Sequence, residues 1–251
     1  MSQLGTLYLI PNTLSSPIDI NHDTLNAVLP TQVQTIVHEC NYFVVETAKV
    51  ARQFLKAVGT QTPLQELHIS ELNVKTPDDA VKQLLAPVLA GHNLGLLSDA
   101  GCPAVADPGA RLVETAHRAG VRVVPLVGPS SILLALMGSG LNGQKFAFHG
   151  YLPIDAAQKS KEIKRLEQES KVHAQTQMFI ETPYRNIQLF ETLLKTLQPN
   201  TRLCVGADLS LPTEWLRTQT VGEWQKSLKS GGAEMTDLNK RPTMFLFLAS
   251  V

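Results

Sequence analysis

The order of hydrophobic and polar residues predicts short apolar strands that alternate with amphipathic helices. Thr6–Ile10, Tyr42–Val45 and Leu94–Leu97 are short, mostly apolar runs that end in polar loops. After the second run, apolar residues between Val50 and Val58 recur three or four positions apart, which is the spacing of one helix face. Strands that alternate with helices in this way form α/β units with a largely parallel sheet.

The same alternation continues along the rest of the chain. Further strands are expected at Leu67–Leu72, Val121–Leu126, Lys145–His149, Gln177–Glu181, Leu203–Ala207, Glu214–Val221 and Thr243–Ala249. Helices are expected at Asp23–Leu29 (stopped before Pro30), Ala48–Val58, Ala80–Ala90, Ala110–Ala119, Ser131–Met137, Asp155–Ser170, Arg185–Leu197 and Glu223–Ser230. Both sides of the loop Leu126–Pro129 hold complete α/β sets. We therefore predict two α/β domains, 1–127 and 128–251, with a mostly parallel sheet in the first and a mixed sheet in the second.

Composition narrows the possible classes of protein. The 251 residues include 22 Lys and Arg against 22 Asp and Glu, so the formal net charge is zero. This balance excludes a protein that bulk charge holds on nucleic acid or on an anionic membrane, although it allows a local basic patch. A hydrophobic content of 43% supplies enough apolar side chains for a core and excludes general disorder.

Other features predict a soluble, cytoplasmic protein. The N-terminus has no positively charged region before its apolar run, unlike a secretory signal. The uncharged stretch between Arg122 and Lys145 is interrupted by Pro and Gly, so it reads as a strand, a turn and a buried helix rather than a membrane span. Cys40, Cys102 and Cys204 are too far apart for a disulfide framework or a CxxC metal site, which favours a reducing compartment.

The segment Ser98–Gly109, SDAGCPAVADPG, is the most informative loop because it follows a strand and precedes a helix. Ligands of open α/β sheets bind at the carboxyl ends of strands. Gly101 lets the backbone approach a ligand closely, Asp99 can accept hydrogen bonds from a ligand, and Asp107 can cap the next helix. The same residues also suit a tight connection in which both aspartates bond only to backbone amides, and composition leaves the two readings open.

Two later strand-to-helix turns offer similar chemistry. Val127–Ser131, VGPSS, precedes a helix whose first amides can bind polar ligand atoms. Glu181–Asn186, ETPYRN, places a carboxylate, an aromatic ring and a guanidinium within six residues. Each turn could equally be a helix start without a ligand.

The order of four segments, SDAGCPAVADPG, VVPLVGPSS, FAFHGYLP and FIETPYRN, resembles the tetrapyrrole-methylase-like (class III) S-adenosylmethionine-dependent methyltransferases. Among these, it is similar to the members that methylate small-subunit ribosomal RNA. GTLYLIP near the start and ADLSLPTEW near the end fall where the family has matching segments, so the resemblance spans nearly the whole chain. It implies a methyl donor in a cleft between two α/β domains, and a homodimer.

The resemblance also implies which residues bind the donor, S-adenosylmethionine. They are Asp99, Ala100, Gly101, Pro129, Ser130, Ser131, Leu152, Pro153, Thr182 and Pro183. A cationic sulfonium, an amino-acid end and an adenine ring call for a carboxylate, free amides and an apolar slot, which these loops can supply. No metal is expected, because the seven histidines show no ligand spacing.

The acceptor side calls for a base and for cations. A ribose hydroxyl is a poor nucleophile, so Glu46 or Asp99 is the expected catalytic carboxylate. Lys49, Arg52 and Arg185 are the expected substrate contacts, because they can bind phosphate. Ribosomal RNA or the small ribosomal subunit is the leading acceptor. Two alternatives stay open, namely a small-molecule acceptor such as a tetrapyrrole, and a donor-binding protein that has lost catalysis.

Overall fold

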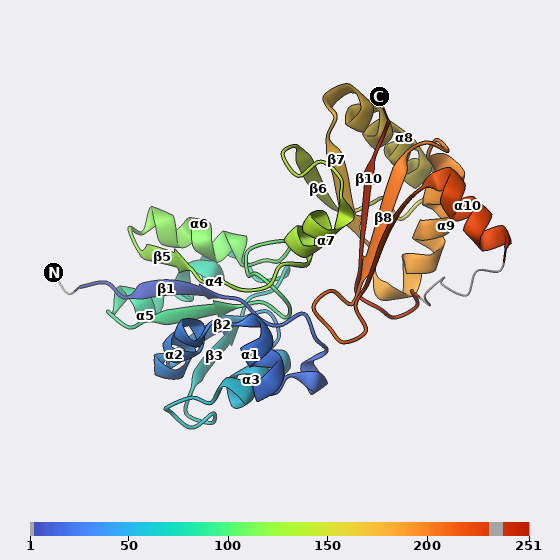
Figure 1. Cartoon of the computed structure of the whole chain (residues 1–251). Helices are drawn as coiled ribbons and strands as arrows, with labels where there is room; N and C mark the ends of the chain where they lie inside the picture. The colour runs from blue at the N-terminus through green and yellow to red at the C-terminus, as the bar shows by residue number, and fades with distance from the viewer. Residues whose placement is uncertain (1–2, 231–237, 251) are drawn as a thin grey trace. The chain divides into compact units, whose positions relative to one another are not determined.

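The structure is a computed structural model that describes residues 3–230 and 238–250. The chain forms two compact units, Met1–Ser130 and Ser131–Val251, and each consists of one sheet with helices packed on it (Figure 1). The domain limits 1–127 and 128–251 remain a prediction. Among the described residues, no helix is long and apolar enough to cross a membrane.

The first unit has a five-stranded, all-parallel sheet in the order β3-β2-β4-β1-β5. Its strands are β1 (Thr6–Ile10), β2 (Tyr42–Val45), β3 (His68–Glu71), β4 (Leu94–Leu97) and β5 (Arg122–Pro125). The central strand β4 is buried along its whole length, as expected for a parallel sheet that is covered on both faces.

Helices cover both faces of this sheet. They are α1 (His22–Val28), α2 (Thr31–Glu39), α3 (Ala48–Val58), α4 (Asp78–Gln83), α5 (Ala86–Leu89) and α6 (Ala110–Arg118), with a 3₁₀ turn η1 at Pro17–Asp19. One apolar core joins Ile10 of β1 to α1, α2 and α3, and the other joins Leu7 to α4, α5 and α6. Leu7 and Ile10 point to opposite faces because side chains alternate along a strand. The predicted α/β class with a parallel sheet is confirmed.

One predicted helix of the first unit was wrong in detail, and one helix was not predicted. Pro30 ends the first helix, as predicted, but it is also the N-cap of α2, a helix that was not predicted. Its φ of −57° suits a helix start, where the missing N–H costs no hydrogen bond. The predicted helix Ala80–Ala90 is two helices, α4 and α5, because Pro87 lies in the first turn of α5 and cannot donate to a continuous helix.

The second unit has a mixed sheet, as predicted, in the order β6-β7-β10-β8-β9. Its strands are β6 (Phe146–Tyr151), β7 (Thr176–Ile180), β8 (Arg202–Ala207), β9 (Trp215–Thr220) and β10 (Thr243–Leu248). Among the described residues of this unit, β6 and β7 pair in parallel and the other neighbouring strands pair antiparallel.

The helices of the second unit are α7 (Ser131–Ser139), α8 (Ala156–His173), α9 (Asn186–Thr196) and α10 (Val221–Lys229), with a 3₁₀ turn η2 at Pro183–Arg185. The core of this unit lies between the sheet and α8, α9 and α10, where Phe179 and Phe245 of the sheet meet Leu189 and Trp224. Helix α7 packs against β8, β9 and β10.

The zero net charge of the chain is the sum of two opposite charges. The first unit has 8 Lys and Arg against 11 Asp and Glu, whereas the second has 14 against 11. The second unit therefore carries the surplus of cations that the composition of the whole chain conceals.

Candidate functional site

Three loops of the first unit leave the sheet side by side. In the parallel registers, Ile10 of β1 and Val45 of β2 both pair with Leu97 of β4, so the loops that follow begin at one edge. The buried Asn12 ties two of them together, because its Nδ2 donates to the carbonyl oxygens of Ser98 (3.2 Å) and Asp99 (3.1 Å). This edge is where open α/β sheets bind ligands.

Asp99, which is predicted to bind the methyl donor and to act in catalysis, accepts hydrogen bonds at the start of α3. Its Oδ1 accepts the Thr47 amide at 3.1 Å and its Oδ2 accepts the Thr47 hydroxyl at 2.7 Å. Thr47 is the N-cap of α3, and its own side chain caps none of the helix amides. Each carboxylate oxygen of Asp99 has a second lone pair, so the side chain can bond to Thr47 and still accept a ligand donor.

Glu46, the other predicted catalytic carboxylate, lies beside Asp99 in the next loop. Its Oε2 accepts the Asp99 amide at 3.3 Å. Burial raises the pKa of Glu46, and repulsion from Asp99 and Asp107 raises it further, against the opposing effect of that hydrogen bond. In the part of the chain that the structure describes, the charged neighbours that act on Glu46 are both acids. A carboxylate whose pKa lies closer to neutrality is a better general base.

A cavity of about 10 Å³ adjoins Glu46, and Asp107 and Gly109 also line it. It has about the room that one water molecule requires, so it cannot hold a methyl donor or a nucleotide. Glu46 and Asp107 therefore line a space no larger than one water, and any larger ligand must bind elsewhere on these loops.

Asp107 stabilises its own loop. Its Oδ1 accepts the amides of Ala104 (2.8 Å) and Gly109 (2.7 Å). Helix α6 begins only at Ala110, and its N-cap, Gly109, has no side-chain cap. The expectation that Asp107 caps the helix was therefore wrong, because the carboxylate bonds to amides that precede the first helical residue. Burial raises the pKa of Asp107 although these two amides oppose the rise.

Two segments of the first unit that are predicted to bind the methyl donor, the loops after β4 and β5, contact each other. The Cys102 thiol donates to the Pro129 carbonyl oxygen at 3.4 Å. Gly101 has a φ of +67°, and a Cβ there would lie 3.2 Å from Leu14 Cδ2 and 3.4 Å from the Pro129 oxygen. A side chain at position 101 would be strained and crowded, so only glycine suits this close approach of the two segments.

The residues of the second unit that are predicted to bind the methyl donor follow β6 and β7 at one edge of the sheet. Tyr151 of β6 pairs with Ile180 of β7 in parallel, so the loops that start at Leu152 and Glu181 leave the sheet together. Leu152 is buried and belongs to the core, whereas Pro153, Thr182 and Pro183 are half-buried.

Glu181 lies at the centre of an ion triad in which Glu181 and Lys159 are buried and Arg185 is partly exposed. Its Oε2 is 3.3 Å from Lys159 Nζ, and its Oε1 accepts hydrogen bonds from Arg185 at 2.7 and 3.0 Å and from the Thr182 amide at 2.7 Å. Burial alone would raise the pKa of Glu181, but the Thr182 amide and the two cations outweigh it and lower the pKa. Glu181 is thus a fixed negative charge that orients Arg185, which is a predicted substrate contact.

Lys49 and Arg52, the other predicted substrate contacts, are exposed on α3, three residues apart. Residues at this spacing lie on one helix face, so both cations can reach the same ligand. Among the described residues, no group of three or more His, Cys, Asp or Glu side chains is placed to hold a metal ion.

Comparison with known proteins identifies the family. The family model described as Tetrapyrrole (Corrin/Porphyrin) Methylases matches residues 28–225. The chain belongs to this family. Membership makes it a methyltransferase that takes S-adenosylmethionine as its methyl donor, which confirms the predicted enzyme class and donor.

Curated relatives within the tetrapyrrole methylases cover most of the chain. One from Mesorhizobium japonicum is 34% identical over 215 residues, which are 86% of this chain and 67% of that protein. Another from Neisseria meningitidis serogroup B is 32% identical over 230 residues, 91% of this chain and 72% of that protein. Both are named "Ribosomal RNA small subunit methyltransferase I".

A solved structure supports the tetrapyrrole methylase fold. The methyltransferase CobJ superposes with a TM-score of 0.61, covering 98% of this chain and 95% of its own, at 14% sequence identity. At this identity the likeness concerns the fold alone.

Three residues that hold the candidate site together were not singled out from the sequence. Asn12 joins the first and fourth strand loops, Thr47 anchors Asp99, and the buried Lys159 pairs with Glu181. Asn12 could have been suspected because it follows a strand directly, where a side-chain amide often bonds to the backbone. Nothing in the sequence distinguishes Lys159, because it lies in a helix with four other lysines and arginines.

Proposed function

We propose that this methyltransferase transfers a methyl group to a ribose 2′-hydroxyl of small-subunit ribosomal RNA. The observation that carries the proposal is the name shared by its curated relatives, which match the chain over most of its length. The surplus of cations in the second unit adds support, because RNA binding requires a local positive surface.

The proposed donor-binding residues lie in loops of the first unit and in loops of the second. In the first unit, the Asp99 carboxylate can accept hydrogen bonds and Gly101 lets the backbone come close. In the second unit, the buried Leu152 offers an apolar wall and Thr182 a hydroxyl group. The full proposed set is Asp99, Ala100, Gly101, Pro129, Ser130, Ser131, Leu152, Pro153, Thr182 and Pro183.

Methyl transfer is an in-line displacement in which the bond from the ribose oxygen to the methyl carbon forms as the carbon–sulfur bond breaks. The donor supplies a methyl group that its sulfonium already activates. Glu46 accepts the proton of the ribose hydroxyl, which general-base catalysis of this kind can accelerate by about 10²–10⁴-fold. Asp99 orients the Glu46 carboxylate through its amide. No proposed step requires a metal.

The remaining parts of the proposal concern partners and location. Lys49, Arg52 and Arg185 contact RNA phosphates, and Arg185 suits this role because Glu181 fixes the direction of its guanidinium. We also propose that the protein acts as a homodimer in the cytoplasm, where ribosomal subunits are available.

Methyl-labelled donor tests the proposed acceptor. Small ribosomal subunits from cells that lack this protein are incubated with it and the donor, and the labelled nucleotide is identified after digestion. Label on a ribose 2′-oxygen supports the proposal. Label that appears only in an added tetrapyrrole supports a small-molecule acceptor, and donor binding without transfer supports a protein that has lost catalysis.

Calorimetry tests the proposed donor site separately. S-adenosylmethionine and its demethylated product are titrated into wild type, Asp99→Ala and Ser130→Ala. Both variants are expected to bind more weakly, whereas Asp79→Ala removes an exposed carboxylate outside the site and serves as the matched control. Wild-type affinity in both site variants would contradict the proposed pocket.

A further inference from the structure

The second unit exposes two tyrosines at the edge where β6 and β7 end. Tyr184, in η2, is 76% exposed, and Tyr151, the last residue of β6, is 59% exposed. The other two tyrosines, Tyr8 and Tyr42, are half-buried. Single exposed apolar residues are normal, but two large rings at one functional edge indicate a surface that another molecule covers.

The cation beside Tyr184 is held in a defined orientation. Arg185 uses Nε and one terminal nitrogen to bond to Glu181, and its side chain is still 34% exposed. The described residues supply no acceptor for the other terminal nitrogen. Glu181 is already balanced by the buried Lys159, so the triad has a net charge of +1, and the only exposed member is Arg185.

We propose that Tyr184 and Arg185 together bind one unpaired nucleotide of the acceptor RNA. The Tyr184 ring stacks on the base, and the free nitrogen of Arg185 contacts a phosphate. Unpaired bases of RNA are commonly held by aromatic stacking, which accepts any base. Lys159 is a positioning residue, because it holds the carboxylate that orients Arg185. This inference rests on the proposed function, since it names how that RNA is held.

Charge favours RNA over a second copy of the chain as the occupant. A symmetric dimer through this patch would bring two copies of the same uncompensated positive charge into one interface, which is unfavourable. The surplus of Lys and Arg in the second unit attracts a polyanion instead.

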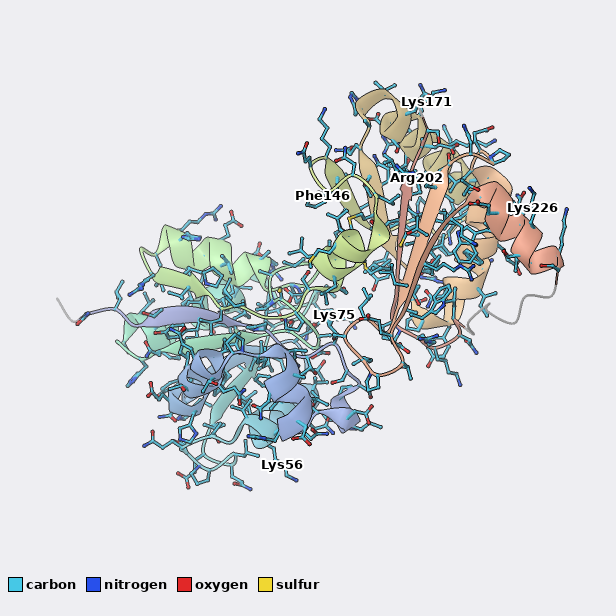
Figure 2. All side chains as sticks on the ribbon, in the orientation of Figure 1. Lys56, Lys75, Phe146, Lys171, Arg202 and Lys226 are labelled. Atoms are coloured by element: carbon cyan, nitrogen blue, oxygen red, sulfur yellow. The ribbon has the colours of Figure 1, made fainter. Side chains whose placement is uncertain are left out.

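Substitutions at Tyr184 test the stacking contact. A short fluorescein-labelled single-stranded RNA and purified small ribosomal subunits are titrated with wild type, Tyr184→Ala and Tyr184→Phe. Loss of one stacked base predicts about 5- to 150-fold weaker binding for Tyr184→Ala, whereas Tyr184→Phe keeps the ring and binds as wild type does. Phe146→Ala is the matched control, because Phe146 is a 40% exposed ring at the opposite end of β6 (Figure 2).

Substitution of Arg185 tests the phosphate contact. Arg185→Gln is expected to reduce the slope of log affinity against log salt by about 0.7, the value of one phosphate contact on a single strand. Lys226→Gln removes an exposed cation of α10 in the same unit and leaves the slope unchanged (Figure 2). Fluorescence of Trp215 and Trp224, which both lie in this unit, reports whether each variant is folded.

Three results would overturn the inference. The first is unchanged RNA affinity in Tyr184→Ala. The second is a weakened affinity for S-adenosylmethionine in the same variant, which assigns the ring to the donor. The third is a change in oligomeric state, which assigns the surface to a second copy. If instead wild type binds RNA but transfers no label to it, the proposed function fails and the stacking contact does not.

Discussion

Glu46 and Glu181 occupy equivalent places in the two units and have opposite surroundings. Each is the first residue after a strand, at the edge where the parallel strands of its sheet end. Burial and two neighbouring acids raise the pKa of Glu46, whereas a backbone amide and two cations overcome burial and lower the pKa of Glu181. The fold places a glutamate at the same position in each unit, but the neighbouring groups determine the direction in which its pKa is shifted.

The same contrast extends to the units that hold them. In the first unit, all strands run in one direction, so the loops after β2 and β4 converge and bring Glu46, Asp99 and Asp107 close together. In the second unit the net charge is positive, and a helix core residue, Lys159, supplies a buried cation to the loop after β7. We infer a division of roles, in which the acidic unit moves the proton and the basic unit holds the polyanion.

Removal of Glu181 is expected to have the largest effect on stability. Glu181→Leu leaves Lys159 buried without its partner, which typically costs about 3–5 kcal/mol. Urea unfolding followed by tryptophan fluorescence measures it, because Trp215 and Trp224 both belong to the second unit.

The double variant Lys159→Met/Glu181→Leu provides the control for that experiment. Replacement of a whole buried ion pair by apolar residues is often neutral or stabilising, so the double variant should regain most of the lost stability. A loss of unfolding free energy below about 1 kcal/mol in Glu181→Leu would show that the Lys159 ammonium reaches water. The electrostatic surroundings of Glu46 and Glu181 would then differ less than the structure indicates.

Loss of Asp99 is expected to have a smaller effect on stability and a larger one on binding. Asp99→Ala removes the acceptor for the Thr47 amide at the start of α3, and a lost cap costs about 1 kcal/mol. Thr47→Val removes one hydrogen bond of the same carboxylate but keeps its charge. Circular dichroism during urea unfolding measures both variants, and calorimetry measures their affinity for the donor.

The two variants should separate the structural role of Asp99 from its proposed contact with the donor. Donor affinity should fall much further in Asp99→Ala than in Thr47→Val, because only the first loses the carboxylate. Equal losses in both would mean that the position of α3, not the charge of Asp99, determines donor binding.

These residues also show what the sequence could predict. Strands β1, β2 and β4 and helix α3 have the predicted bounds, because strict periodicity and clear loop residues mark them. Helix α2 was missed because Pro30 both follows one helix and caps the next. The order of loops was enough to place Asp99 at a strand end, since that follows from the chain itself.

The partners of the site residues could not be predicted. Thr47 bonds to Asp99 across 52 positions, and Lys159 reaches Glu181 across 22. Such pairs depend on sheet register and on the rotation of a helix about its axis, which local patterns do not contain. The sequence therefore indicated the chemistry of each loop but not whether Asp99 and Glu181 were free or already bonded.

The pH dependence of stability should have opposite signs for the two glutamates. The folded-state pKa of Glu46 lies above its ordinary value of 4.5, so between these values only the folded protein keeps the proton. Stability therefore falls as pH rises through that window, and the loss persists above it. Glu46→Gln removes the effect and should be more stable than wild type at neutral pH, with the difference vanishing below about pH 4.

The folded-state pKa of Glu181 lies below its ordinary value of 4.5. Its ionised form stabilises the folded protein above that value, and the contribution is lost as pH falls through the lowered pKa. Glu181→Gln should therefore be less stable than wild type at neutral pH, and part of the difference should disappear in acid. Urea unfolding between pH 3 and 8 measures both variants, and a same-sign pH dependence would contradict the contrast.

Lys49 and Arg52 provide the finest test, because they are exposed cations on the acidic unit. Surface charges such as these should change stability by less than about 0.5 kcal/mol when replaced by Gln. If both contact phosphates, each substitution should reduce the salt slope of RNA binding by about 0.7, as at Arg185. A salt slope that falls in all three variants would show that cations of each unit contribute to RNA binding, whereas a slope that responds only to Arg185→Gln would confine RNA binding to the basic unit. In that second case Lys49 and Arg52 would not contact RNA, and the acidic unit would contact RNA only at the reacting ribose.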